Sequence, residues 1–230
     1  MTPLLQVENF SKAFLAKKGF AHTLSLRILS RFKKQNLSQS IYVFEKLNLS
    51  IFPGECLAIH GINGSGKSTL LRCLAGVTAP TEGFKKSNAT LLALLSHGFG
   101  AYEDLATWRN MLLVQQLFGL NLEKAEKNIE KLASIAGLSD RLDSPSSQLS
   151  EGMRAKIAIS ALYFCSFDLL LIDESLNHVD AEFRSWFHAL TREWISMGRS
   201  IVITSHDSTL LEQFGTRHLR MENKSLISLA

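Results

Sequence analysis

"CLAIHGINGSGKSTLLRCLA", residues 56–75, is the stretch that decides the fold of this 230-residue chain. Its first five residues form an apolar run that predicts a buried strand, and the residues from Lys67 onward have the pattern of a helix. Between them, Gly61 to Thr69 fits the pattern G-x-x-x-x-G-K-[ST]. A glycine-rich loop between a strand and a helix directs backbone N–H groups and the positive end of a helix dipole at one point, which suits phosphate binding.

Each polar residue of this loop has an expected role toward a nucleotide. Glycines let the backbone N–H groups point inward at phosphate oxygens. Lys67 is expected to reach the β and γ phosphates, and the Ser68 hydroxyl is expected to hold Mg²⁺. The residues expected to surround the nucleotide here are Gly61, Asn63, Gly64, Ser65, Gly66, Lys67, Ser68 and Thr69.

Two further apolar runs end in residues that suit phosphate chemistry. "FDLLLIDE" ends in Asp173, expected to bind Mg²⁺, and Glu174, expected to polarise the attacking water. "SIVITSHD" places His206 at the carboxyl end of another predicted strand, where α/β proteins bind ligands. The alternatives are a solvent-facing acidic pair and an ordinary histidine at the end of a strand.

"LSEGMRAKIAIS", Leu149 to Ser160, predicts a helix that begins after Ser150. Ser150 could serve only as an N-cap, which is the commonest role of serine there. Gly152, however, weakens the first turn unless another group must approach it closely. A serine hydroxyl, a bare glycine backbone and a helix N-terminus together also form an anion site, so both interpretations stay open.

The remaining pattern alternates apolar β runs with helices, which predicts a largely parallel α/β sheet. We expect a turn at Pro53-Gly54 and a short buried strand in "ATLLALL". Gly137 is expected to end a helix that starts at Leu122. The predicted strands lie at 4–10, 43–52, 55–60, 89–95, 169–172 and 200–204. The predicted helices lie at 67–75, 107–118, 122–136 and 181–197, with one more that begins after Ser150.

The order of "GINGSGKST", "LSEGM", "LLLIDE" and "TSHD" resembles the ATP-binding-cassette (ABC) ATPases over most of the chain. The resemblance implies a P-loop NTPase fold of the ABC nucleotide-binding type, with a RecA-like core, an antiparallel β subdomain and a helical subdomain at about 100–165. Residues 1–230 would form one such domain. In this family the "LSGGQ"-type signature of one subunit closes over ATP on the phosphate loop of the other, which implies a homodimer. Ser150 and Gly152 match the signature, whereas Glu151 and Met153 depart from its usual glycine and glutamine.

Within that family the chain is most similar to the ATPases of bacterial polysaccharide exporters, which serve capsule, O-antigen and teichoic-acid export. "NHVDAEF" stands where those proteins have "AVGDARF", so Asp180 matches the acidic residue of the loop that meets the partner subunit. The resemblance implies an ATP-hydrolysing subunit that energises glycan export through a separate integral membrane permease, with residues 102–108 at the contact. The alternatives are an exporter of another substrate, such as haem, and a regulatory module that binds ATP without hydrolysis.

Two family positions stay ambiguous in the sequence. The usual glutamine after the "ATLLALL" strand is absent, and His97 lies near its place. His97 either takes over the role of the glutamine, or its loop only touches the membrane partner. Tyr42 is the candidate for stacking on adenine, and Phe44 is the competing choice, because one of the two must face the core.

The basic charge of the chain is concentrated in one segment. Residues 9–44 contain seven Lys/Arg and no Asp/Glu, which leaves 18 basic and 21 acidic side chains elsewhere. Residues 15–40 read as an inserted amphipathic basic helix, suited to an anionic membrane surface or a partner's groove, or else a solvated helix packed on the sheet. The segment lacks aromatics spaced for base stacking, so nucleic acid is not an expected partner.

The composition also bears on location. No apolar run of about 18 residues suggests a membrane span, and the N-terminus has no signal-peptide pattern. The three cysteines are scattered, which is typical of reduced thiols in the cytosol. We therefore expect a peripheral protein on the cytoplasmic face of the bacterial inner membrane.

Overall fold

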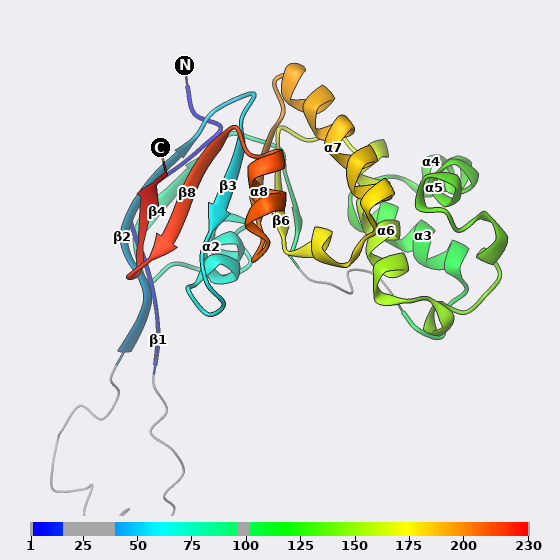
Figure 1. The fold of residues 1–230 in the computed structure, drawn as a ribbon, viewed down its shortest axis with the longest axis horizontal. Helices are drawn as coiled ribbons and strands as arrows, with labels where there is room; N and C mark the ends of the chain where they lie inside the picture. Colours follow the sequence, from blue (N-terminus) through cyan, green and yellow to red (C-terminus); the bar gives the residue numbers. More distant parts are fainter. Residues whose placement is uncertain (1, 16–39, 96–101, 230) are drawn as a thin grey trace, which may run out of the picture.

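The computed structural model describes residues 2–15, 40–95 and 102–229. Figure 1 shows an antiparallel sheet at one end, a larger sheet in the middle and a group of helices at the other end. The predictions for His97 and for residues 16–39 fall outside the described residues. This arrangement matches the predicted combination of a central α/β core with a β part and a helical part.

The smaller sheet has three antiparallel strands in the order β2-β1-β4. They are β1 (Leu5–Leu15), β2 (Ser40–Ile51) and β4 (Glu82–Ser87). β1 extends past the predicted end at Phe10, because its outer half pairs with β2 beyond the core. β4 was not predicted, since all six of its residues are exposed and they give no alternating apolar pattern.

The larger sheet has six strands in the order β5-β6-β7-β3-β8-β9, parallel except for the last pair. The strands are β3 (Cys56–His60), β5 (Leu91–Leu94), β6 (Leu169–Asp173), β7 (Ser200–Thr204), β8 (Arg217–Glu222) and β9 (Ser225–Ser228). The predicted parallel sheet is therefore confirmed. β5 is less buried than expected because it is an edge strand, and only Leu94 is fully enclosed.

The helices are α2 (Lys67–Leu74), α3 (Thr107–Leu117), α4 (Leu122–Lys127), α5 (Ile129–Ala136), α6 (Glu151–Ala161), α7 (Ala181–Ser196) and α8 (Ser208–Phe214). The single predicted helix over 122–136 is wrong, because the chain makes two helices that meet at Asn128. The Asn128 N–H bonds to the carbonyl of Ala125, three residues back, and its side chain donates to Gln115 Oε1 at 3.0 Å. Gly137 ends α5 with φ 68°, as predicted.

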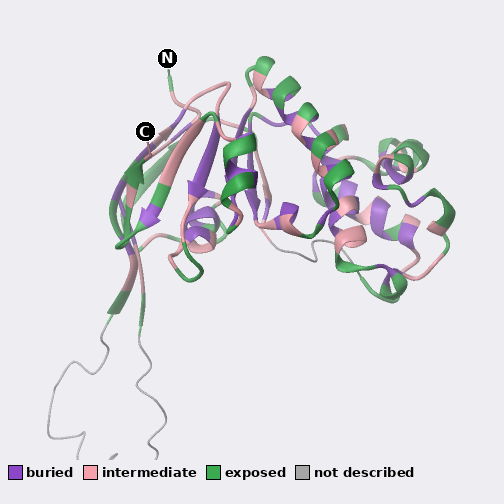
Figure 2. Cartoon of the chain, in the orientation of Figure 1, coloured by how far each residue is buried: buried purple, intermediate pink, exposed green. Residues whose placement is uncertain are grey.

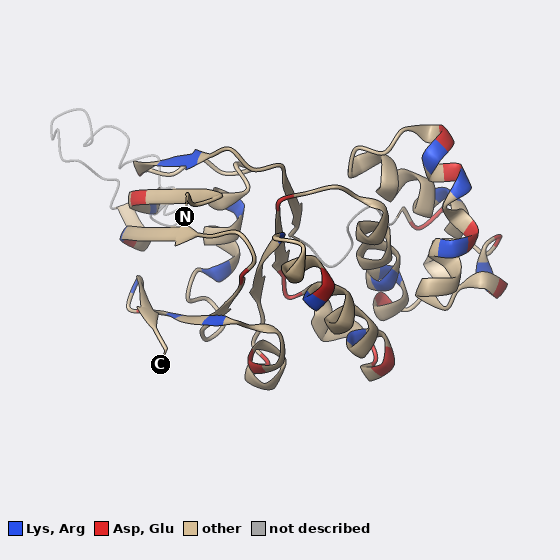
Figure 3. Ribbon diagram, turned by 90° about the horizontal axis from the view of Figure 1, so that it is seen from above, with Lys and Arg blue, Asp and Glu red and all other residues tan. Residues whose placement is uncertain are grey.

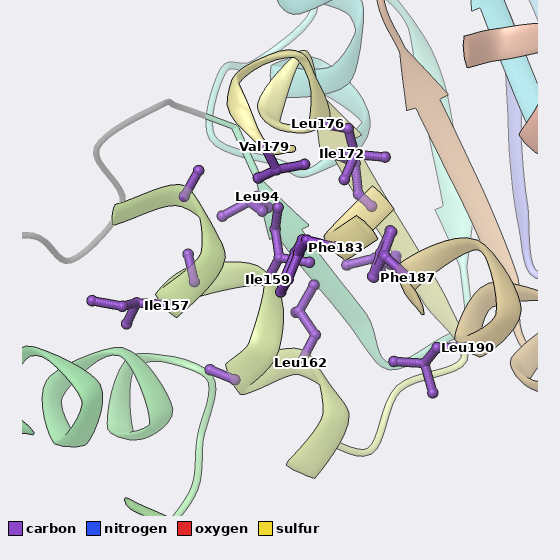
Figure 4. Close-up of a cluster of buried hydrophobic side chains, with 14 of the residues drawn as sticks. Leu94, Ile157, Ile159, Leu162, Ile172, Leu176, Val179, Phe183, Phe187 and Leu190 are labelled. Carbon is purple, nitrogen blue, oxygen red and sulfur yellow. The ribbon is translucent and has the colours of Figure 1, made fainter. Parts of the chain in front are cut away.

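The core lies on both faces of the larger sheet, because successive strand residues point to opposite sides. Leu169 and Leu171 face the cluster shared with α2 and the antiparallel sheet. Leu170 and Ile172 face a second cluster, shared with α6, α7 and the helical end. The central strands β3, β6 and β7 are buried along almost their whole length. Figure 2 shows β3 buried while the outer faces of α7 and α8 are exposed, and Figure 4 shows α6 and α7 side chains meeting the sheet in the second cluster.

The helical end consists of α3, α4 and α5, which pack on one another and on α6. Because α6 also packs against the sheet side of the molecule, it joins the two parts. Charged residues of both signs alternate over these helices in Figure 3. One example is the exposed ion pair between Lys127 Nζ and Glu123 Oε1, 2.6 Å apart.

Candidate active site

The predicted site residues come together at one edge of the larger sheet. Strands β6, β7 and β3 are parallel neighbours, so their carboxyl ends meet at the same edge. Gly61 follows β3, Asp173 ends β6 and His206 follows β7. Open α/β sheets bind ligands outside the carboxyl ends of their strands, so this edge is where a ligand is expected.

The shape of the phosphate loop depends on its glycines. Gly66 has φ 108°, a conformation that side chains rarely adopt, and it precedes the first residue of α2. A Cβ atom on Gly66 would also lie 2.6 Å from Val43 Cγ1. Val43 of β2 and Met221 of β8 therefore pack closely against the loop at Gly66.

Inside the loop, Lys67 is held by backbone oxygens. Its ammonium group donates to the carbonyls of Gly61 at 2.7 Å and Ile62 at 3.1 Å, and the residue is only 4% exposed. Ser65 Oγ is buried and has no hydrogen-bond partner among the described residues. A buried ammonium and an unpaired hydroxyl in a glycine-rich loop at the start of a helix fit a phosphate ligand.

The carboxylates at the end of β6 have different surroundings. Asp173 is buried, and its Oδ1 accepts a hydrogen bond of 2.6 Å from the hydroxyl of Thr204 on the neighbouring strand. Glu174 has φ 54°, the left-handed region that a non-glycine residue enters at a cost of about 1–2 kcal/mol. Such strain is typical of functional positions. The bend turns Glu174 toward Lys67, with Oε1 4.0 Å from Nζ.

His206 lies on the other side of Glu174, with Nδ1 3.7 Å from Oε2. The Ser205 hydroxyl donates to Asn177 Oδ1 at 2.7 Å, so the amide nitrogen of Asn177 faces His206 Nδ1 at 3.1 Å. With the Asn177 amide in this orientation, the tautomer of His206 that fits the contact accepts at Nδ1 and has its N–H at Nε2. That N–H is in position to donate to a ligand, because the side chain is 57% exposed.

Tyr42 and Phe44 lie in different surroundings, and only one of them faces the core. Phe44 is fully buried and stacks on Phe10 with ring centroids 5.9 Å apart. Tyr42 instead lines a cavity of about 980 Å³ together with the phosphate loop and His206. Its hydroxyl donates to Glu82 Oε1 at 3.1 Å, and this hydrogen bond raises the pKa of the phenol.

Asp180 caps α7, accepting a hydrogen bond of 2.9 Å from the Phe183 N–H, and forms an ion pair with Lys156 of α6. The hydrogen bond from Lys156 is the main reason that the pKa of Asp180 is lowered. Asp180 therefore stays ionised where the loop after β6 meets α6.

The start of α6 resolves part of the ambiguity at Ser150 and Gly152. Ser150 is an N-cap, with Oγ accepting from the Met153 N–H at 3.2 Å. A methyl group on Gly152 would overlap the backbone carbonyl of His178. The close approach inferred from this glycine is thus made by the same chain, which is a sufficient reason for glycine there. The role of this helix start toward a phosphate stays a prediction.

Sequence reasoning missed the residues that support the predicted ones, namely Thr204, Asn177, Ser205, Lys156 and Glu82. Thr204 was within reach of the pattern, because it ends the strand that pairs with β6, opposite Asp173. The others act across turns or between distant strands, where no spacing rule connects them.

Comparison with known proteins identifies the family. A family model described as ABC transporter matches residues 44–177, more than half of the chain. The chain belongs to this family. It is an ABC-type ATPase, and the predicted family and fold class are confirmed.

Similar ABC proteins include several export components. The O-antigen export system ATP-binding protein RfbB of Klebsiella pneumoniae is 31% identical over 79% of this chain and 74% of its own length. The teichoic acids export ATP-binding protein TagH of Shouchella clausii is 25% identical over 97% of this chain and 61% of its own. The cytochrome c biogenesis ATP-binding export protein CcmA of Cupriavidus necator is 29% identical over 80% of this chain and 83% of its own.

Among solved structures, the ABC ATPase fold is similar to that of the ATP-binding cassette MJ0796, a dimer in a post-hydrolysis state bound to ADP and Pi. The TM-score is 0.76 at 20% identity, covering 96% of each chain. The likeness covers the sheets and the helical end together, so the whole described architecture is that of the family.

Proposed function

We propose that residues 1–230 form one nucleotide-binding domain that hydrolyses ATP as a homodimer and drives transport through a separate permease. The observation that carries the proposal is the position of Glu174 between Lys67 and His206, at 4.0 and 3.7 Å, at the carboxyl edge of the sheet. A carboxylate, an ammonium group and an imidazole N–H in this order suit attack of water on a terminal phosphate.

Each residue has a proposed part in the reaction. Lys67 exchanges its backbone carbonyl partners for the β and γ phosphate oxygens. Glu174 orients and polarises the attacking water, and His206 donates its Nε2–H toward the γ-phosphate. Ser68 and Asp173 would hold Mg²⁺, which neutralises phosphate charge when bound, and Thr204 keeps the Asp173 carboxylate in one orientation.

A second copy completes each site in this proposal. Ser150 and Gly152 of one subunit would cover the ATP held by the phosphate loop of the other, and Asp180 would meet the partner's loop. Support comes from the exposed N-terminus of α6, whose dipole favours an anion, and from the dimeric state of the similar MJ0796 cassette. Half of the groups that stabilise charge would then arrive from the partner, so a lone subunit should hydrolyse ATP poorly.

The decisive experiment is the variant Glu174→Gln, which keeps the shape of the side chain but removes its charge. With ATP at millimolar concentration it should elute as a dimer in size-exclusion chromatography, because it binds ATP without hydrolysing it. The matched control is Glu123→Gln on the exposed face of α4, which should behave like the wild type. A Glu174→Gln protein that stays monomeric with ATP would refute the paired site.

The proposed contact with the permease lies on the helical part, about residues 100–165, around residues 102–108. Tyr102 is 61% exposed there, which supports a role in binding an apolar partner. No helix in the part of the chain that the structure describes is long and apolar enough to cross a membrane. We propose a peripheral position on the cytoplasmic face of the bacterial inner membrane, supported by the similarity to ATP-binding proteins of export systems.

A membrane contact near residues 15–40 is proposed as well. The described ends of β1 and β2 beside this segment carry Phe14, Leu15 and Ile41, which are 51, 69 and 59% exposed. Exposed apolar side chains beside a basic segment suit an anionic lipid surface. Cosedimentation with vesicles containing anionic lipid should therefore fall when these three residues are replaced by serine.

The proposed cargo is a polysaccharide or related glycan, supported by the similarity to O-antigen and teichoic-acid export proteins. Similarity to a cytochrome c biogenesis export protein favours a second candidate, a haem-exporter-like role. Deletion of the gene separates them. Loss of surface polysaccharide with intact c-type cytochromes supports the first, and loss of mature cytochrome c supports the second.

A further inference from the structure

The start of α6 touches the loop that follows β6 at three points within one chain. The backbone of Gly152 lies against the carbonyl oxygen of His178. Glu151 Oε2 lies 3.7 Å from His178 Nδ1. One turn further along α6, Lys156 forms its ion pair with Asp180. The helix start and the loop therefore form one packed unit.

Glu151 creates an electrostatic difficulty at this place. A carboxylate in the first turn of a helix is favoured by the helix dipole. The same carboxylate repels any phosphate that approaches the N-terminus, which is the approach that the proposed function requires of Ser150. Glu151 is about half exposed, so it is near the surface at which the partner would bind.

The imidazole of His178 faces Glu151 and forms an ion pair with it only in its protonated form. His178 comes from the segment after β6, and its side chain is 33% exposed against 52% for Glu151. Both residues lie where the chain departs from the pattern that it resembles: Glu151 stands in place of the signature glycine, and His178 lies in "NHVDAEF", which replaces "AVGDARF". The two departures therefore meet in one contact.

We infer that His178 is a positioning residue that draws the Glu151 carboxylate toward the loop after β6 and so leaves Ser150 and Gly152 accessible to an incoming phosphate. The inference rests on the proposed paired site. It means that a chain with glutamate in the signature "LSEGM" needs a basic side chain of its own to hold that glutamate away from the phosphate.

The test asks whether a second substitution restores what a first one removes. ATP turnover is measured with Glu174 intact, and ATP-dependent dimerisation is measured in proteins that also carry Glu174→Gln. His178→Ala should lower turnover and raise the ATP concentration for half-maximal dimerisation by about five-fold, the size expected for a partly exposed charge pair. Glu151→Gln in the same chain should restore both values to within two-fold of the wild type. The loss in His178→Ala should also shrink at high salt, which screens the freed carboxylate.

A purely structural role for His178 would not be rescued by removing a charge on another element. The matched control is the exposed Lys127–Glu123 pair, where Lys127→Ala alone or with Glu123→Gln should change neither value. The inference is overturned if His178→Ala changes neither value, or if its loss persists in the variant that also carries Glu151→Gln. As long as the wild type hydrolyses ATP, either result leaves the proposed function standing. A wild type that neither hydrolyses ATP nor dimerises overturns both.

Discussion

Replacing Gly152 by alanine tests the close packing between α6 and the loop after β6. Gly152 has no positive φ, so alanine is strained there only by the overlap with the carbonyl of His178. Neither partner is a flexible side chain, and the two backbones must separate by about 1 Å to restore ordinary contact. Overpacking of this kind costs about 1–3 kcal/mol, against a gain of about 1 kcal/mol in helix propensity.

The net loss in the free energy of unfolding is therefore about 1 kcal/mol, which lowers the melting temperature of a domain of this size by about 3 °C. The effect on ATP turnover should be larger, about ten-fold or more, because a shift of about 1 Å in a positioning element can cost about a hundred-fold. Melting curves and a phosphate-release assay measure the two effects. The control Ser134→Ala, at an exposed position of α5, gains propensity without overlap. A Gly152→Ala protein that melts at or above the wild type and turns over ATP normally would refute the packing argument.

Four further predictions concern single side chains. Asp180→Asn keeps the α7 cap but loses the ion pair with Lys156. Because the pKa of Asp180 is lowered from the usual 3.8, the pair stabilises the wild type fully above that value and loses its effect as the pH falls below the lowered pKa. The melting temperatures of variant and wild type should therefore differ at pH 7 and approach each other only on strong acidification. The pKa of His60 is lowered by burial and by its neighbours, so stability falls as pH drops below about 6.5, and His60→Asn should reduce that fall in melting curves between pH 7 and 5. Thr204→Val removes the hydrogen bond to Asp173, the predicted magnesium ligand, and should raise the Mg²⁺ concentration for half-maximal turnover about ten-fold. ATP binding without Mg²⁺ should stay unchanged, and an unaltered Mg²⁺ requirement would contradict the prediction. Tyr42→Ala should weaken ATP binding about ten-fold in a fluorescence titration, whereas Tyr42→Phe should stay within two-fold.

Much of the central sheet was predictable because its strands are apolar runs that end in polar residues. The runs before Gly61, Asp173 and Ser205 each gave a strand within one residue of its observed bounds. The strands β4 and β8 could not be found in this way, since charged residues interrupt them and their pairing depends on distant partners. The break between α4 and α5 was missed for a similar reason: the Asn128 side chain bonds to Gln115 on another helix.

In the candidate site, too, some features were predictable from the sequence and others were not. Motif spacing was enough to predict that Lys67, Glu174 and His206 meet, because parallel strands bring their carboxyl ends together. It was not enough to predict what faces Gly152, because the approaching group is a backbone carbonyl with no sequence signature of its own. The identity of the side chains predicted the chemistry of the site. Only the packing showed that the group against Gly152 comes from the same chain.

The exposed strand β4 has a consequence for how copies of the chain associate. It is the outer strand of the three-stranded sheet, so the backbone groups on its free side would accept a strand from another molecule. Lys85 and Lys86 are adjacent on it, and like charges on two such edges repel when they are brought together. Edge-to-edge stacking into fibres is thereby disfavoured, even at high protein concentration.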